Sequence, residues 1–160
     1  MSEDRPQVVF DCMIYLQALV SEMGPAAALL RLVDDQEISL FLSYEILEEI
    51  HDVLSRPKIR QKNVHITDDR IAAFVTRIAE KATIIDNVPQ HFNFMRDPKD
   101  EKYINLAVEV EANYIISRDR DLLDLMTGYS EECKEFRRRF RPLKVIEPVS
   151  FLNSVTGTST

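Results

Sequence analysis

Two groups of acidic residues follow short apolar segments that are typical of buried strands. Asp11 comes directly after the apolar run at residues 8–10, and Asp119 follows the run at residues 114–117, with Asp121 close behind it. In a parallel α/β sheet, functional groups gather outside the carboxyl ends of the strands. If these two strands are neighbours, Asp11 and Asp119 face one another across a small gap.

A third candidate acid lies on the helix that is expected after the second strand. Ser43 can cap this helix, and its apolar residues form one stripe, made of Ile46, Leu47, Ile50, Val53 and Leu54. At about 100° per residue, Glu49 falls at the border of the stripe, Glu45 lies further round, and Glu48 points nearly opposite. We therefore expect Glu49 to reach a partly buried site and Glu45 to support it from the helix N-terminus.

A further pair of acids surrounds Pro98 at the start of another expected helix. Asp97 is explained as an ordinary N-cap. Asp100 lies on the same helical face as Ile104 and Ala107, which are expected to face the core. The acid at position 100 either adds favourable charge to the first helical turn or belongs to a partly buried site.

Four acids from separate segments could thus converge at one end of the sheet, namely Asp11, Glu49, Asp100 and Asp119. Carboxylates that close raise one another's pKa unless cations lie among them. Mg²⁺ and Mn²⁺ prefer such all-oxygen surroundings. The sequence therefore predicts a divalent metal site at this end of the sheet.

The elements that must position these acids alternate between strand and helix. Strands are expected at 7–11, 38–42, 83–86, 114–117 and 143–146, and helices at 14–23, 25–33, 43–54, 67–82, 97–111 and 121–126. We expect loops at 58–65 and 89–95, and the charged segment 127–141 has no clear assignment. This alternation predicts an α/β fold with a mainly parallel sheet that is covered on both faces.

Bulk properties narrow the class of protein. The 160 residues fit a single domain, with a core at about 7–152 and an unordered tail at 153–160. Cys12 and Cys133 are too few for a disulfide framework or a zinc ribbon. The sequence contains neither an apolar signal core nor a membrane span, so we expect a cytoplasmic protein without membrane contact. A net charge of −7 argues against nonspecific coating of duplex DNA, although bound cations would reverse the local field.

Several segments resemble the PIN-domain family, and more narrowly its branch of toxin components of bacterial toxin–antitoxin pairs. They are Val9-Phe10-Asp11, residues 43–50 followed by 53–58, residues 97–102 with Leu106-Ala107, and residues 114–123. No single motif is specific, but their order and spacing together are. The resemblance covers about residues 8–152.

The resemblance implies a three-layer α/β/α sandwich and Mg²⁺- or Mn²⁺-dependent hydrolysis of single-stranded RNA. By position, the family's four acids correspond in order to Asp11, Glu49, Asp100 and Asp119, with Asp121 as an accessory metal ligand and Ser117 as the hydroxyl residue before the last acid. Metal-activated water would attack the phosphodiester and leave a 5′-phosphate. The resemblance also implies a homodimer and an antitoxin protein as partner.

An acidic ribonuclease needs local basic surface to attract its substrate. Two basic clusters are candidates, one at residues 56–62 and one at residues 134–141. The candidate RNA contacts are Arg56, Lys58, Arg60, Arg118, Arg137 and Arg138. The alternative for each cluster is a solvated charged face, and the later cluster could also bind a protein partner.

The first motif departs from the family. The family usually has Asp-Thr-Asn or Asp-Ser-Asn, whereas this sequence has Asp11-Cys12-Met13. Met13 cannot supply the hydrogen bonds of an asparagine amide, so a catalytically impaired module that binds RNA or protein is the alternative. A phosphatase of the haloacid dehalogenase type would need a second Asp at position 13. We expect Tyr15, Tyr44, Tyr103 and Tyr114 to be packing residues.

Overall fold

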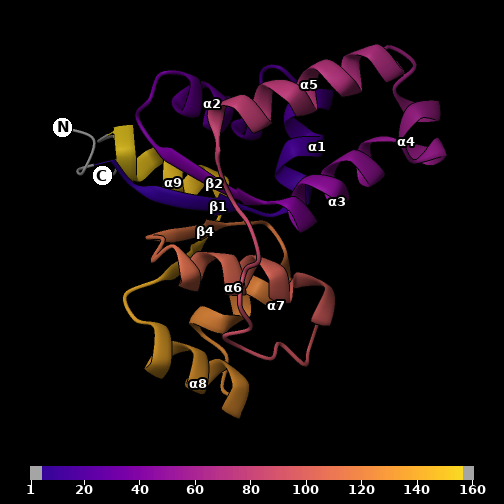
Figure 1. Cartoon of the computed structure of the whole chain (residues 1–160). Helices are drawn as coiled ribbons and strands as arrows, with labels where there is room; N and C mark the ends of the chain where they lie inside the picture. The colour runs from indigo at the N-terminus through magenta and orange to yellow at the C-terminus, as the bar shows by residue number, and fades with distance from the viewer. Residues whose placement is uncertain (1–4, 157–160) are drawn as a thin grey trace.

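Five short strands form one parallel sheet in the order β3-β2-β1-β4-β5 (Figure 1). The strands are β1 (Gln7–Phe10), β2 (Ser39–Ser43), β3 (Thr83–Ile85), β4 (Tyr114–Ile116) and β5 (Lys144–Ile146). This computed structural model describes residues 5–156. All five strands lie where the alternation of the sequence predicts them.

Helices cover both faces of the sheet, which confirms the predicted three-layer α/β/α architecture. Figure 1 shows α1 (Cys12–Val20), α2 (Pro25–Asp34), α3 (Tyr44–Leu54) and α5 (Asp68–Lys81) on one side. The other side carries α6 (Glu101–Glu109), α7 (Arg120–Leu123) and α8 (Glu131–Phe140). The short α4 (Pro57–Lys62) follows α3, and α9 (Pro148–Thr156) packs against α2.

The central strands are apolar along their length because both of their faces are covered. Val8, Val9, Phe10, Ile115 and Ile116 are fully buried. The chain leaves the core at the carboxyl ends of these strands. The polar residues that follow β1 and β4 therefore lie at the edge of the core.

Short polar side chains start several of the helices, and Ser43 does so at the position that the sequence predicts. The Ser43 hydroxyl accepts a hydrogen bond from the backbone N–H of Ile46, and the Thr67 hydroxyl accepts one from Arg70. Pro25 is the first residue of α2. These caps satisfy backbone groups that have no partner inside the helix.

Three expectations need correction. Residues 57–62 form α4, not a loop, with Pro57 in the first turn. The unassigned segment contains α8, which Ser130 caps and which buries Cys133 and Phe136. The end of α9 at Thr156 shortens the expected tail, since residues 153–156 are helical and residues 157–160 lie outside the described part.

Within residues 5–156, no single helix has both the length and the apolar character needed to cross a membrane. The pair α1 and α2 reaches that length and composition together, with a bend of 100° between the two helices.

Candidate metal centre

The candidate site lies where the strand order of the sheet reverses. β1 pairs with β2 on one side and with β4 on the other, and Phe10 is in register with Ile116. Such a switch point opens a crevice outside the carboxyl ends of the strands. Asp11 and Asp119 both emerge there, so the prediction that their strands are neighbours is confirmed.

Asp11 is held rigidly at the end of β1. It caps α1, and its Oδ1 accepts hydrogen bonds from the N–H groups of Met13 (3.0 Å) and Ile14 (3.3 Å). Only 4% of the residue is exposed. Burial raises the pKa of Asp11 to about 6, although the hydrogen bonds from Ser117, Ile14 and Met13 oppose this rise.

Ser117 links the two strand ends. Its buried hydroxyl donates a hydrogen bond to Oδ2 of Asp11 and accepts one from the backbone N–H of Asp119 at 2.9 Å. Oδ1 of Asp119 in turn accepts from the N–H groups of Asp121 (2.8 Å) and Leu122 (3.3 Å) at the start of α7. The hydroxyl before the last acid therefore fixes the relative position of both carboxylates.

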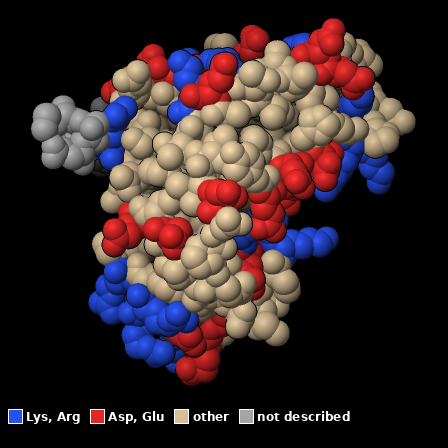
Figure 2. Space-filling model, in the orientation of Figure 1, with Lys and Arg blue, Asp and Glu red and all other residues tan. Residues whose placement is uncertain are grey.

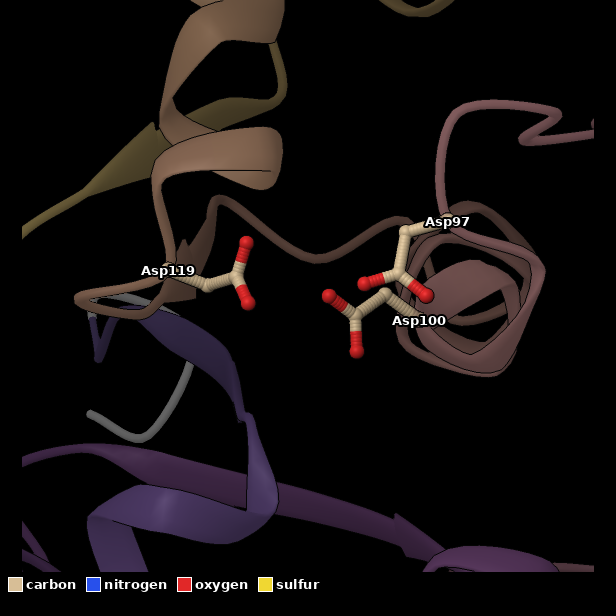
Figure 3. A group of neighbouring side chains, drawn as sticks. All are labelled: Asp97, Asp100 and Asp119. Carbon is tan, nitrogen blue, oxygen red and sulfur yellow. The ribbon is translucent and has the colours of Figure 1, made fainter.

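Three carboxylates face one another across the crevice, as Figure 3 shows for Asp97, Asp100 and Asp119. One oxygen of each lies within 4.8 Å of an oxygen of the others. Asp97 precedes the 3₁₀ turn Pro98–Asp100, and Asp100 is the last residue of this turn before α6. Asp97 is the expected N-cap, since its carboxylate accepts from the N–H of Lys99 at 3.2 Å. It also belongs to the acidic group, a role that its capping function hides in the sequence.

Asp100 has the largest pKa shift among the acids of the site. Burial raises its pKa to about 8, and the negative charges of Asp119, Asp97 and Asp11 add to the rise. Its Oδ2 is buried and has no hydrogen-bond partner among the described residues. An unpaired buried oxygen beside further carboxylates fits a hard divalent cation, which binds through oxygen ligands.

Glu49 occupies a different environment beside this group. Its Oε1 accepts a hydrogen bond from the hydroxyl of Tyr103, and its Oε2 lies 3.2 Å from Nζ of Lys102. The Tyr103 hydroxyl also accepts from the N–H of Cys12 at 3.1 Å. Glu49 is half-buried, as expected, but α6 supplies a cation and a phenol that hold its carboxylate. Neither contact is apparent from the sequence.

The tyrosines only partly match their expected roles. Tyr15 and Tyr103 are buried, but Tyr103 is also a hydrogen-bonding residue of the site, and Tyr44 is 56% exposed. The expectation that Tyr44 is a packing residue is therefore wrong. Burial raises the pKa of the Cys12 thiol to about 12, so this thiol stays neutral near pH 7.

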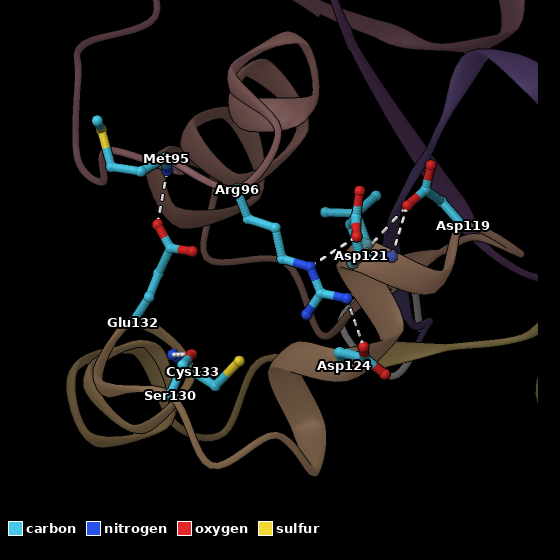
Figure 4. A network of polar contacts seen from close by, with 9 residues as sticks. Met95, Arg96, Asp119, Asp121, Asp124, Ser130, Glu132 and Cys133 are labelled. Atoms are coloured by element: carbon cyan, nitrogen blue, oxygen red, sulfur yellow. Dashed lines mark hydrogen bonds and ion pairs between the residues drawn. The ribbon is translucent and has the colours of Figure 1, made fainter.

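The carboxylate of Asp121 is paired with a cationic side chain of the protein. Arg96 contacts Oδ1 of Asp121 through Nε at 2.6 Å and Oδ2 of Asp124 through a terminal nitrogen at 2.7 Å (Figure 4). Its single positive charge is therefore shared between the two carboxylates and offsets one of their two negative charges. Glu45 is exposed in the first turn of α3, and no contact within residues 5–156 joins it to the acids.

A cavity of about 360 Å³ adjoins the acids, lined by Asp11, Met13, Ile14, Gln17, Arg118 and Asp119. Met13 is 44% exposed, so its apolar side chain borders the space next to two acids. Arg118 brings a cation to the same wall. Of the candidate RNA contacts, Arg118 is therefore the one that the structure places beside the carboxylates.

The other candidate RNA contacts lie on α4, on its N-terminal boundary and on α8. Arg60 forms an ion pair with Asp68 at 2.6 Å, and Arg137 donates to the backbone carbonyls of Leu125 and Gly128. Arg56, Lys58 and Arg138 are exposed. Figure 2 shows Lys and Arg gathered near α8 and Asp and Glu gathered across the middle of the same face.

Comparison with known proteins agrees with this geometry. Residues 7–121 match the PIN domain. The chain is also 32% identical over 152 residues to an uncharacterised protein of Methanocaldococcus jannaschii, and the match covers 95% of this chain and 93% of the relative. PIN domains are generally nucleases that use divalent metals, which accords with a group of acids at a switch point. The chain belongs to the PIN-domain family.

Proposed function

We propose that the protein is a metal-dependent endoribonuclease that hydrolyses single-stranded RNA. The observation that carries the proposal is the group of Asp97, Asp100 and Asp119, in which Asp100 has a buried oxygen without a partner. Asp11 lies beside this group and contributes to its repulsion. A divalent cation would stabilise this arrangement, and Mg²⁺ or Mn²⁺ suits its oxygen ligands.

The acids and their neighbours would have distinct tasks. Asp100 and Asp119 would hold the cation together with Asp11 or Asp97, while Ser117 keeps Asp11 and Asp119 in position. When bound, a divalent ion supplies a more acidic water and offsets the charge on the scissile phosphate. Glu49, which lies beside Cys12 and Tyr103, would keep Lys102 as its counter-ion.

Arg118 supports the choice of a phosphodiester substrate. Its side chain is exposed on the wall that also contains Asp11 and Asp119. A guanidinium can bind phosphate oxygens through two parallel hydrogen bonds. A strand whose phosphate contacts Arg118 would lie next to the acids.

A direct assay tests the activity. Labelled single-stranded RNA should be cleaved in Mn²⁺ or Mg²⁺ to products with a 5′-phosphate, and cleavage should stop in EDTA. The Asp100→Asn variant should lose this activity, whereas Asp86→Asn, which changes an exposed acid, should retain it. Equal activity of wild type and Asp100→Asn would contradict the proposal.

The resemblance to toxin components leads to a cellular proposal. The protein would act in the cytoplasm as a homodimer and be neutralised by an antitoxin protein. Controlled expression should then arrest growth, and Asp100→Asn should relieve the arrest. Growth arrest of the same size by both forms would contradict a toxic ribonuclease.

A binding module without turnover is the second candidate. Two observations favour it: Met13 borders the acid cavity with an apolar side chain, and Lys102 with Tyr103 holds Glu49. This candidate predicts that RNA binding persists although no divalent metal supports cleavage. Metal-dependent cleavage that Asp100→Asn abolishes would exclude it.

A further inference from the structure

A second and larger cavity adjoins the acid cavity. It has a volume of about 640 Å³ and lies between the C-terminal half of α1, the start of α2 and the start of α9. Gln17 and Arg118 line both cavities. The two spaces therefore share a wall, and Arg118 borders both of them.

The lining of this larger cavity, which we call the groove, is mainly apolar. Leu16, Val20 and Val149 contribute to its walls, and Val20 and Val149 remain 37% and 54% exposed. Its polar groups include Gln17, Arg118 and Glu147. A small set of polar groups around apolar walls, in a volume of this size, is typical of a pocket for a small organic ligand.

The start of α2 adds a feature that suits an anion. This ten-residue helix begins at the groove, where Gly24, Pro25 and Ala26 form part of the lining. No side chain caps its N-terminus. Pro25 has no N–H, so the N–H groups of Ala26 and Ala27 and the positive end of the helix dipole are what favour a phosphate here. Arg118 lies on the wall of the same groove.

We propose that the groove between α1, α2 and α9 binds one nucleotide of the single-stranded substrate next to the scissile phosphate. The base would pack on the apolar walls, and its flanking phosphate would lie between Arg118 and the start of α2. The carboxylate of Glu147 would accept hydrogen bonds from base amino groups. This inference rests on the proposed ribonuclease function, because the wall shared with the acid cavity selects the occupant.

The test compares two substrates of the full-length protein. Single-stranded RNA can fill the groove, whereas bis(p-nitrophenyl) phosphate has a scissile phosphodiester but no neighbouring nucleotide. Val149→Glu puts a negative charge into the groove, and Val155→Glu makes the same change on α9 outside the groove lining. Both valines are partly exposed, so neither change disrupts the core.

Val149→Glu should lower the ratio of RNA cleavage to bis(p-nitrophenyl) phosphate hydrolysis about tenfold, mainly through a higher KM for RNA, because it repels a phosphate and removes apolar contact. Val155→Glu should keep the wild-type ratio. Equal ratios for the two variants would overturn the groove assignment while leaving the nuclease intact. Absence of hydrolysis of both substrates by the wild type would instead refute the proposed activity.

A binding measurement separates the two proposals further. Asp100→Asn protein should bind a fluorescent single-stranded RNA, and adding Val149→Glu should weaken this binding about tenfold. If the wild type shows no cleavage but Val149→Glu still weakens RNA binding about tenfold, the result would support the groove and contradict the nuclease. A change in oligomeric state caused by Val149→Glu alone, seen by light scattering, would identify the groove as a protein interface and overturn the inference.

Discussion

Acidic residues in two neighbouring parts of the molecule have opposite environments. Asp97, Asp100 and Asp119 face one another across the crevice, and Asp100 keeps a buried oxygen without a partner. Asp121 and Asp124, only a few residues further along the chain, share the guanidinium of Arg96. The two parts differ in their counter-charges. Arg96 pairs with Asp121 and Asp124, whereas Oδ2 of Asp100 has no partner among the described residues and needs an external cation.

Removing one carboxylate charge from each part of the molecule should give the largest difference in cleavage rate. Asp119→Asn should lower metal-dependent cleavage about a thousandfold, since the metal contributes several kcal/mol to the transition state. Asn can still cap α7, so the fold should persist. Asp121→Asn should change the rate less than about tenfold, because Arg96 already neutralises that carboxylate. Steady-state cleavage of labelled RNA measures both rates, and equal losses would make Asp121 a ligand of the site.

Metal should stabilise the folded protein only through the unpaired acids. Mg²⁺ or Mn²⁺ at about 100 times its dissociation constant should raise the free energy of unfolding by about 2.7 kcal/mol. Asp100→Asn should lose most of this increase, and Asp121→Asn should retain it. Chemical denaturation with and without EDTA provides the measurement. Equal stabilisation of all three proteins would show that the metal binds elsewhere.

Without metal, the same acids should make stability depend on pH. Burial and neighbouring charges raise the pKa of Asp100 from 3.8 to about 8, so the folded protein holds this proton more tightly than the unfolded chain. Unfolding then releases a proton between these values, and the free energy of unfolding should fall as pH rises from about 4 to about 8.

Two variants resolve the origin of this pH dependence. Asp100→Asn should confine the decline to pH values below about 6, where Asp11 titrates. At pH 8, in EDTA, this variant should be more stable than the wild type, because it lacks the repelled charge. Asp124→Asn should keep the wild-type profile. A profile that rises from pH 5 to pH 8 in EDTA would contradict the repulsion at the crevice.

Sequence patterns could predict the strands and the main acids because those features are local. The apolar run at residues 8–10 predicts a strand, and an acid directly after it must leave the core at the sheet's edge. Adjacency of β1 and β4 then brings Asp11 and Asp119 together. Helical geometry and the resemblance to the PIN domain both pointed to Glu49 and Asp100. The structure groups Asp100 with Asp97 and Asp119, whereas Glu49 contacts Tyr103 and Lys102.

Other features depend on contacts between distant segments. Asp97 joins the acids although its capping role explains it fully in the sequence. Lys102 and Tyr103 reach Glu49 from α6, more than fifty residues away along the chain. The apolar side of α8 was obscured because charged residues surround Cys133 and Phe136. In each case, a local pattern has a sufficient local explanation, and only packing shows the second role.

Lys102 acts on both kinds of acid, because it pairs with Glu49 and its charge also affects Asp100. Its removal should change metal binding less than the loss of any crevice aspartate. Its Nζ lies 3.2 Å from Glu49, its side chain is only 13% exposed, and its charge also lowers the pKa of Asp100. Lys102→Met keeps an unbranched side chain of similar length but leaves Glu49 without its counter-ion. The crevice would then carry one more unbalanced negative charge.

This additional charge should strengthen divalent-metal binding by about three- to tenfold, which corresponds to a modest Coulomb energy at the edge of a protein. Isothermal titration with Mn²⁺ measures the change, with Lys99→Met, an exposed lysine in the turn before α6, as the control. Weaker binding in Lys102→Met would mean that the lysine organises the crevice instead of competing with the metal for Glu49. Glu49 would then be an acid that a protein cation already pairs, as Arg96 pairs Asp121 and Asp124. The metal site would consist of aspartates alone.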